Sequence, residues 1–409
     1  MAETEIGDYD VVGSQVCLIL VGVCNYHRVM SVVSIVKCDS YEAGEVDKAV
    51  GQAVRLAGLD DLLKNRSVLL KPNLLSTRKP NDAVTTHPEI VRSLGKLAIG
   101  AGCVVSIGDS PPFAGRSPEK YARLCKVTGM AEVAQDLNVP VVRFEYASRD
   151  VPNIREGIYK HFEIAEAVLD ADVVVNISKL KTHGLTGYTG AVKNVFGCVP
   201  GVRKGLYHVQ ASEDRTVFAQ MLVDLLGTVK PAMHVMDAVV GMDGDGPNNG
   251  RPKQIGLIMA SKDAVALDAV ACAVVGIDPL SIETTRLAAE QGLGCGEIGS
   301  IEIKGERVED VLVEDFRPSS GRSEWNRIPV PIRRLLRRKL VAIPVVRNKE
   351  CTGCGDCASV CPVGAITRTR PAVIDLEKCI RCYCCSEVCN FGAIDLKMSW
   401  LGRVLGWMK

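Results

Sequence analysis

The chain carries CTGCGDCASVCPVGAI at residues 351–366 and CIRCYCCSEVCNFGAI at residues 379–394. Both stretches have the spacing C-x2-C-x2-C-x3-C. Three thiolates two residues apart can bind one iron–sulfur cube, while the fourth reaches the other cube. A zinc site is disfavoured, because zinc ligands come as two separated pairs. The spacing therefore predicts two 4Fe–4S clusters.

The fourth cysteine of each run is expected to serve the cluster of the other run. The predicted ligands are Cys351, Cys354, Cys357 and Cys389 for the first cluster, and Cys379, Cys382, Cys385 and Cys361 for the second. The runs lie 28 residues apart (351 to 379) and both end in Gly-Ala-Ile, which is typical of an internal repeat. Residues 348–398 thus resemble a bacterial-type two-cluster ferredoxin, a small α+β domain. One departure is Asn390, where that family usually has proline.

Composition limits the class of protein. The 409 residues carry a net charge of only +1, so nothing indicates nucleic-acid binding. The cysteines outside the two runs lack ligand spacing and favour a reducing cytoplasm. Residues 1–29 are expected to be an unstructured extension, with no signal peptide and no apolar stretch long enough to span a bilayer. Two oxygen-sensitive clusters favour an anaerobic or low-oxygen host.

Residues 30–315 alternate β-branched apolar runs with helical patterns, which predicts a mainly parallel α/β module. A length of about 285 residues favours two lobes. The expected strands are Ser31 to Val36, Ser67 to Leu70, Cys103 to Ile107, Val139 to Phe144, Asp172 to Asn176, His234 to Met236 and Ile255 to Met259. The expected helices are Glu42 to Ala57, Pro88 to Ile99, Arg215 to Val229, Ala264 to Val275 and Ile282 to Gln291.

A basic linker is predicted at residues 316–347, with an amphipathic helix between Pro331 and Pro344. Its arginines serve one of two purposes in this prediction: they bind an acidic partner or an anionic membrane surface, or they form the solvated face of a linker helix. A second amphipathic helix is expected in the tail, residues 399–409.

Polar residues follow the apolar cores of several predicted strands, where ligands bind in open α/β sheets. They occur in LLKPNLL (69–75), GDSP (108–111), SKLKTHGLTGYTGAVKNVFGCVPG (178–201) and VMDAVVGMDGDGP (235–247). Together with TTHPEIV (85–91) and ASKDAVALDAVA (260–271), these phrases resemble the domain-of-unknown-function 362 family, often fused to a two-cluster ferredoxin. The resemblance implies this domain arrangement and cluster content, but no settled substrate.

The glycine-rich stretch before Lys193 enters a helix, whose free N–H groups favour an anion. We therefore predict a phosphate or carboxylate site; the alternative is a flexible loop with solvated lysines. The proposed anion ligands are Lys71, Asn73, Lys179, Lys181, Gly187, Gly190 and Lys193.

Four residues are candidates for acid–base chemistry. His183 and His87 either transfer protons or are structural. Asp109 and Asp237 either act as acids or bases, hold a divalent cation, or cap turns.

Three functions fit these features. The first is an iron–sulfur oxidoreductase that exchanges single electrons with an anionic substrate or cofactor. A redox partner protein or another low-potential donor would supply the electrons. The second is an electron-carrier subunit whose α/β module docks a partner enzyme. The third is a non-redox isomerase or lyase with a ferredoxin sensor. No G-x-G-x-x-G follows a predicted strand, so an ordinary flavin or nicotinamide site is not indicated.

Overall fold

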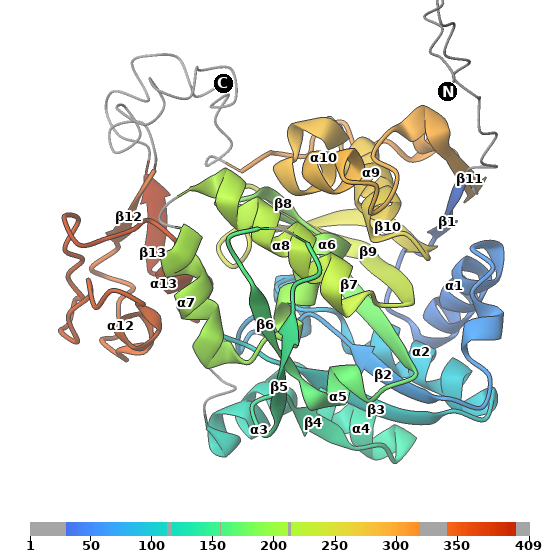
Figure 1. The fold of residues 1–409 in the computed structure, drawn as a ribbon, viewed down its shortest axis with the longest axis horizontal. Helices are drawn as coiled ribbons and strands as arrows, with labels where there is room; N and C mark the ends of the chain where they lie inside the picture. The colour runs from blue at the N-terminus through green and yellow to red at the C-terminus, as the bar shows by residue number, and fades with distance from the viewer. Residues whose placement is uncertain (1–29, 113–116, 156, 212–213, 320–341, 398–409) are drawn as a thin grey trace, which may run out of the picture. The chain divides into compact units, whose positions relative to one another are not determined.

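The apolar strands between Ser31 and Gly305 form one nine-stranded sheet in this computed structural model (Figure 1). The structure describes residues 30–112, 117–155, 157–211, 214–319 and 342–397. The expected N-terminal extension, linker helix and tail helix lie outside these residues. The strands of the sheet are β1 (Ser31–Lys37), β2 (Ser67–Lys71), β3 (Val104–Asp109), β4 (Val141–Arg143), β7 (Val173–His183), β8 (Gly187–Thr189), β9 (Met233–Asp243), β10 (Arg251–Ser261) and β11 (Ile301–Gly305).

The sheet is mixed and mostly parallel, with the strand order β11-β1-β10-β9-β7-β2-β3-β4 and with β8 paired to β7. The pairs from β9 through β4 along this order are all parallel, whereas β10 is antiparallel to both of its neighbours. The predicted α/β class is therefore confirmed. In place of the two lobes that length suggested, one sheet spans the module, because β10 joins β1 to the strands of the other half.

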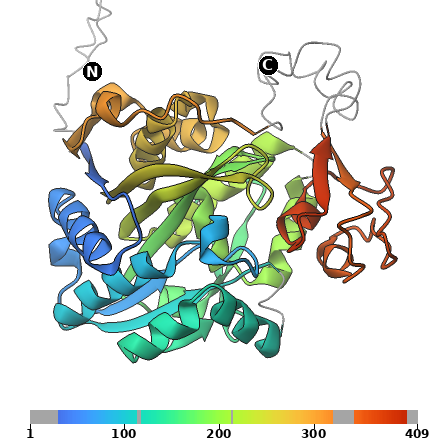
Figure 2. The ribbon, with the colours of Figure 1, turned by 180° about the vertical axis from the view of Figure 1, so that it is seen from behind.

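Helices cover both faces of the sheet, and the side chains of each strand alternate between two cores. In β2, Leu69 faces one core while Val68 and Leu70 face the other. Figure 2 shows the first set of helices, in blue to teal, in front of the sheet. This set is α1 (Ala43–Leu56), α2 (Pro88–Gly100), α3 (Pro118–Val127) and α4 (Met130–Leu137). The opposite core contains α5 (Glu166–Leu169), α6 (Ala191–Asn194), α7 (Gly201–Ala211), α8 (Arg215–Val229), α9 (Ala264–Val274) and α10 (Glu283–Glu290).

Smaller elements complete the described chain. A separate hairpin consists of β5 (Ser148–Pro152) and β6 (His161–Ala165). Short 3-10 turns cover Asp60–Leu62, Pro80–Asp82, Val195–Cys198, Pro279–Ser281, Ile298–Ser300 and Val308–Val311. The cysteine-rich region contains β12 (Ile343–Val346), α12 (Asp356–Val360), α13 (Cys384–Glu387) and β13 (Ile394–Lys397), and β12 pairs antiparallel with β13.

One boundary differs in a way that matters for the site. The predicted strand ends at Asn176, with the following lysines beyond the sheet. Instead, β7 continues to His183 and is buried throughout. Its lysines are tolerated in the sheet because polar groups on neighbouring segments bind them, as described below.

Candidate functional site

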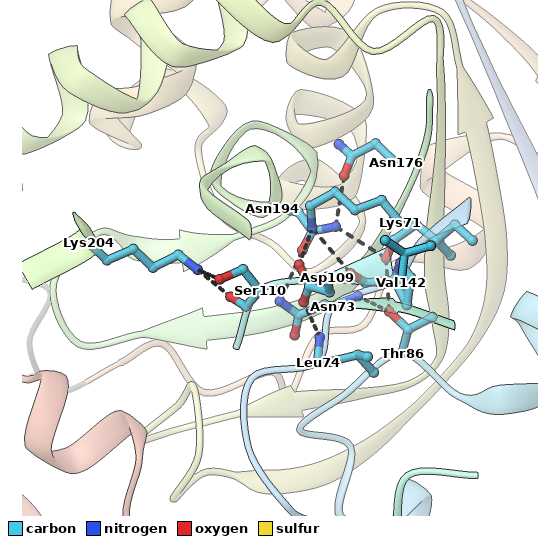
Figure 3. A network of polar contacts seen from close by, with 12 residues as sticks. Lys71, Asn73, Leu74, Thr86, Asp109, Ser110, Val142, Asn176, Asn194 and Lys204 are labelled. Carbon is cyan, nitrogen blue, oxygen red and sulfur yellow. Dashed lines mark hydrogen bonds and ion pairs between the residues drawn. The ribbon is translucent and has the colours of Figure 1, made fainter. Parts of the chain in front are cut away.

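The ends of β2 and β3 are joined by a buried ion pair (Figure 3). Lys71 Nζ lies 2.9 Å from Asp109 Oδ1, and both side chains are almost fully buried. The backbone N–H of Leu74 donates to Asp109 Oδ2 at 2.8 Å. A side chain at Gly197 would collide with both members of the pair, so this glycine leaves the space that the pair occupies. Asp109 is thus neutralised by a lysine, which leaves it poorly suited to a divalent cation.

A chain of amides extends this pair across the sheet. Asn73 Nδ2 donates to Asn194 Oδ1 at 3.0 Å, and Asn194 Nδ2 donates to Asn176 Oδ1 at 2.8 Å. Thr86 Oγ1 accepts from the Asn73 N–H and donates to the Ile177 carbonyl. We call Lys71, Asn73, Thr86, Asp109, Asn176, Lys181 and Asn194 the strand-end network.

Lys181 completes the network from β7. Its Nζ donates to Asn73 Oδ1 at 2.7 Å and to the Val84 carbonyl at 2.6 Å. Burial, with the nearby charges of Lys193 and Lys179, lowers the pKa of Lys181 well below the ordinary lysine value. An anion beside Lys181 would stabilise its charged form.

Lys179, Asp237 and His87 form a separate buried cluster. Lys179 Nζ lies 2.9 Å from Asp237 Oδ2, across the register of β7 and β9. Tyr41 OH donates to Asp237 Oδ1 at 2.8 Å, and its ring stacks on His87 at 3.5 Å between centroids. Burial lowers the pKa of His87 to about 4. Two predicted catalytic residues therefore meet here, but Asp237 already has a lysine, a tyrosine and the His87 N–H as partners.

The start of α6, after the glycine-rich loop, already binds a carboxyl group that belongs to the chain. Gly190 precedes α6, and the N–H groups of Ala191 and Val192 donate to the two oxygens of Asp268 from α9, at 2.6 and 2.9 Å. A Cβ at Gly190 would collide with the same carboxylate. The N–H groups that sequence analysis assigned to a ligand are thus used by Asp268. Gly187, in β8, has a φ of 77°, which favours glycine at that turn.

His183, the last of the four acid–base candidates, lies against the cysteine-rich region. Its Nδ1 accepts from the N–H groups of Leu185 and Thr186 at 3.0 and 3.3 Å, so its proton lies on Nε2. Nε2 is 3.0 Å from Glu387 Oε1. Burial lowers the pKa of His183 to about 4. Burial opposes ionisation of Glu387, but Lys193 and His183 outweigh it and lower its pKa to about 2. The contact therefore pairs a neutral imidazole with a carboxylate.

Four cysteine side chains surround one cavity. Its lining includes Cys351, Cys354, Cys357 and Cys389, the four residues predicted for the first cluster. The Cys389 sulfur also accepts from the Ala393 N–H at 3.2 Å. Among the described residues, no three His, Cys, Asp or Glu side chains are placed to hold a single metal ion. Four thiols around a shared space, with an N–H directed at a sulfur, fit a 4Fe–4S cube.

Backbone N–H groups are also directed at sulfurs of the second predicted ligand set. The Cys361 sulfur accepts from the Ala365 N–H at 3.2 Å, and the Cys379 sulfur from the Arg381 N–H at 3.4 Å. Burial raises the pKa of Cys379, and the neighbouring Cys382 and Cys361 raise it further. These thiols are thus close enough to repel one another as thiolates, and a metal cluster would hold them deprotonated.

Comparison with known proteins assigns the α/β module. The model of a domain of unknown function, DUF362, matches residues 68–273, which is half of the chain. The chain belongs to the DUF362 family. A 4Fe–4S dicluster domain matches residues 350–393, so the DUF362 module is followed by an iron–sulfur domain of the ferredoxin type, as predicted.

One curated relative of this DUF362 chain is the thylakoid-associated protein sll1697 of Synechocystis sp. (strain ATCC 27184 / PCC 6803 / Kazusa). It is 34% identical over 267 residues, which cover 64% of this chain and 79% of the relative. The lactate racemase apoprotein from Thermoanaerobacterium thermosaccharolyticum matches with 13% identity and a TM-score of 0.37, over 58% of this chain and 55% of that one. The chain thus spans about half of that structure, and the likeness is too slight to bear on fold or activity.

Several polar residues of the DUF362 module were missed by sequence analysis. Lys204 of α7 donates to the backbone and hydroxyl oxygens of Ser110, and burial lowers its pKa to about 8. A lysine in an ordinary helical pattern gives no sign of this. Asp268 did give a signal, because it is an acid within an otherwise apolar helix. Tyr41 and Asn194 are recognisable only from their partners in space.

Proposed function

We propose that this DUF362 protein is an iron–sulfur oxidoreductase that exchanges electrons with an anionic substrate or cofactor at the strand-end network. The supporting observation is a contact between the two regions. Asn248, in the loop after β9, donates from Nδ2 to the carbonyl of Cys389 at 2.7 Å. The same asparagine accepts from Ser76, in the loop that begins at the strand-end network. A predicted cluster ligand is therefore tied to the part of the α/β module where ligands of open sheets bind.

The proposal includes two 4Fe–4S clusters. The cavity around the first set of cysteines supports Cys351, Cys354, Cys357 and Cys389 as one ligand group, and the repeat supports the second group by analogy. When bound, such clusters supply or accept one electron each. Two such clusters would therefore supply an electron pair to an organic acceptor, which would take up two protons. A low-potential donor protein would restore the pair.

The residues of the strand-end network would bind and orient the acceptor. Lys181 supplies the cation, since an anion relieves the unfavourable burial of its charge. Asn73 holds the Lys181 ammonium in place. Lys193 adds a second positive charge, which acts on Lys181 and His183 alike. We assign the anion to these two lysines rather than to the Gly190 N–H groups, which Asp268 uses.

Cellular location stays a prediction. None of the described helices has the length and apolar character needed to cross a bilayer. We retain the cytoplasm as the proposed location, with contact to a membrane surface through the basic linker as a further proposal.

The test begins with anaerobic purification, an iron and sulfide count, and reduction with dithionite. We expect about eight irons per chain. Reduced protein is then mixed with a panel of carboxylates and phosphates, and the EPR signal of the reduced clusters is followed. At least one anion should reoxidise them. Lys181→Met should abolish this reoxidation and keep the iron content, whereas Lys126→Met, at an exposed position of α3, should change neither. If no small anion reoxidises the clusters and only a protein does, the carrier function replaces this proposal.

A further inference from the structure

The loop after β2, residues 72–86, contacts both the strand-end network and the cysteine-rich region. At its start, Asn73 binds Lys181 and Asn194. Three residues later, Ser76 donates to Asn248 Oδ1 at 3.0 Å. Thr77 and Arg78 then contact the segment that follows Cys389. A few residues of backbone thus connect the candidate ligand site to a predicted cluster ligand.

Asn390 receives two of these contacts. The Thr77 N–H donates to Asn390 Oδ1 at 3.1 Å, and Arg78 Nη1 donates to the Asn390 carbonyl at 2.8 Å. The corresponding residue of the first run is Pro362, and a proline side chain has no acceptor. The departure of Asn390 from the usual ferredoxin sequence therefore supplies an oxygen that the α/β module binds.

Asn248 holds the preceding residue. Its side chain is almost fully buried, at 1% exposure, and its Nδ2 donates to the Cys389 carbonyl, which also accepts from the Gly392 N–H. The adjacent Asn249 donates from Nδ2 to the Ile394 carbonyl of β13 at 2.8 Å, with a longer contact of 3.5 Å to Ser386 Oγ. Two neighbouring asparagines thus bind the same region, and only one of them binds the ligand cysteine.

We propose that Asn390 and Asn248 are positioning residues that fix the Cys389 segment to the loop after β2 and adjust the electrostatic environment of the cluster bound by Cys389. This rests on the proposed assignment of Cys389 as a cluster ligand. The amide N–H of Asn248 points its positive end towards that residue, which favours the additional negative charge of a reduced cluster. Asn390 fixes the distance between the Cys389 segment and the loop after β2, because both its side chain and its backbone carbonyl accept hydrogen bonds from that loop.

The experiment compares Asn248→Ala with Asn249→Ala in the full, iron-loaded chain without added substrate. Redox titration followed by EPR reports the reduction potential of each cluster. Asn248→Ala should lower the potential of one cluster, because a positive dipole is lost, and leave the other unchanged. Asn249→Ala should leave both at the wild-type values. Equal shifts in the two variants, or no shift in either, would overturn the proposal.

Hydrogen exchange of the Thr77 N–H tests Asn390 independently of the potentials. Asn390→Pro introduces the residue usual in ferredoxins, so cluster loading should persist while Thr77 loses its acceptor. Its exchange should accelerate by about fivefold or more, the factor that corresponds to one hydrogen bond of ordinary strength. Asn390→Asp keeps an acceptor oxygen and should preserve the slow exchange. Unchanged exchange in Asn390→Pro would contradict the inference, whereas failure of the anion panel would affect only the proposed function.

Discussion

The two cysteine runs share their backbone geometry around the fourth cysteine but have different surroundings. The sulfur of the fourth cysteine accepts an N–H at 3.2 Å in both, from Ala365 and from Ala393. The glycines before these alanines, Gly364 and Gly392, have φ values of 62° and 61°. The repeat thus preserves the geometry around the thiols, as expected if both runs bind the same kind of cluster.

The runs differ where the second one contacts the α/β module. Gly355 of the first run corresponds to Tyr383, which keeps a positive φ of 62° although it is not glycine. Tyr383 is 2% exposed, packs in the main core, and donates to the Ala342 carbonyl at 2.8 Å. Likewise Ser359 corresponds to Glu387, the partner of His183. The similar backbone near the thiols thus fits a shared cluster geometry, while contact with the α/β module explains why the second run has Tyr383 and Glu387 where the first has Gly355 and Ser359.

The largest expected effect comes from removing the fourth cysteine of either run. Cys389→Ser and Cys361→Ser should each lose one cluster, leaving about four of about eight irons. Because the two cysteines are predicted to serve different clusters, the EPR signals that remain should differ between the variants. Iron and sulfide analysis with EPR measures both.

Cys384 provides the control for this comparison. It corresponds to Asp356 in the first run, so it has no predicted ligand role. Cys384→Ser should retain all of the iron. Loss of the same EPR signal from Cys389→Ser and Cys361→Ser would refute the exchanged pairing of the fourth cysteines.

Docking of the second run is tested by Tyr383→Ala. Removing a buried aromatic side chain costs about 3 kcal/mol or more of stability. Gly355→Ala, at the equivalent position of the first run, should cost only about 1 kcal/mol, the penalty for a side chain at positive φ. Anaerobic thermal unfolding should give the lower midpoint for Tyr383→Ala. Equal midpoints would mean that the second run is no more firmly docked than the first.

Local patterns allowed much of this molecule to be predicted from sequence. The bounds of α8 were predicted correctly because its signals are adjacent: Asp214 caps the N–H groups of Thr216 and Val217, and an apolar pattern follows. The spacing of the cysteines is also a local signal, and the 4Fe–4S dicluster domain that it indicates is matched at residues 350–393, while the division of the thiols between two cubes stays a prediction.

Residues far apart in the chain set the limits of prediction. Lys179 is compatible with a buried strand only because Asp237, 58 residues later, lies beside it in the sheet. Asp268 reaches the start of α6 from α9, so the loop resembled an empty anion site in the sequence. Asp268 is visible locally as an acid in an apolar helix, but no local pattern shows which group Asp237 or Asp268 binds.

The smallest effect concerns pH and the buried His208 of α7, which lies close enough to Glu387 of the cysteine-rich region and to Lys193 of α6 for their charges to act on it. Burial lowers the pKa of His208 to about 4, below the ordinary value of 6.5. As the pH falls, the unfolded chain therefore binds the proton before the folded chain does. The free energy of unfolding decreases as the pH falls from about 6.5 to about 4.

His208→Phe should keep the stacking on Phe218, whose ring centroid is 4.5 Å away, and remove this loss of stability. The fall in the free energy of unfolding between pH 7 and pH 5.5 should then shrink by about 1 kcal/mol. A pH dependence of His208→Phe identical to that of the unaltered chain would contradict this prediction.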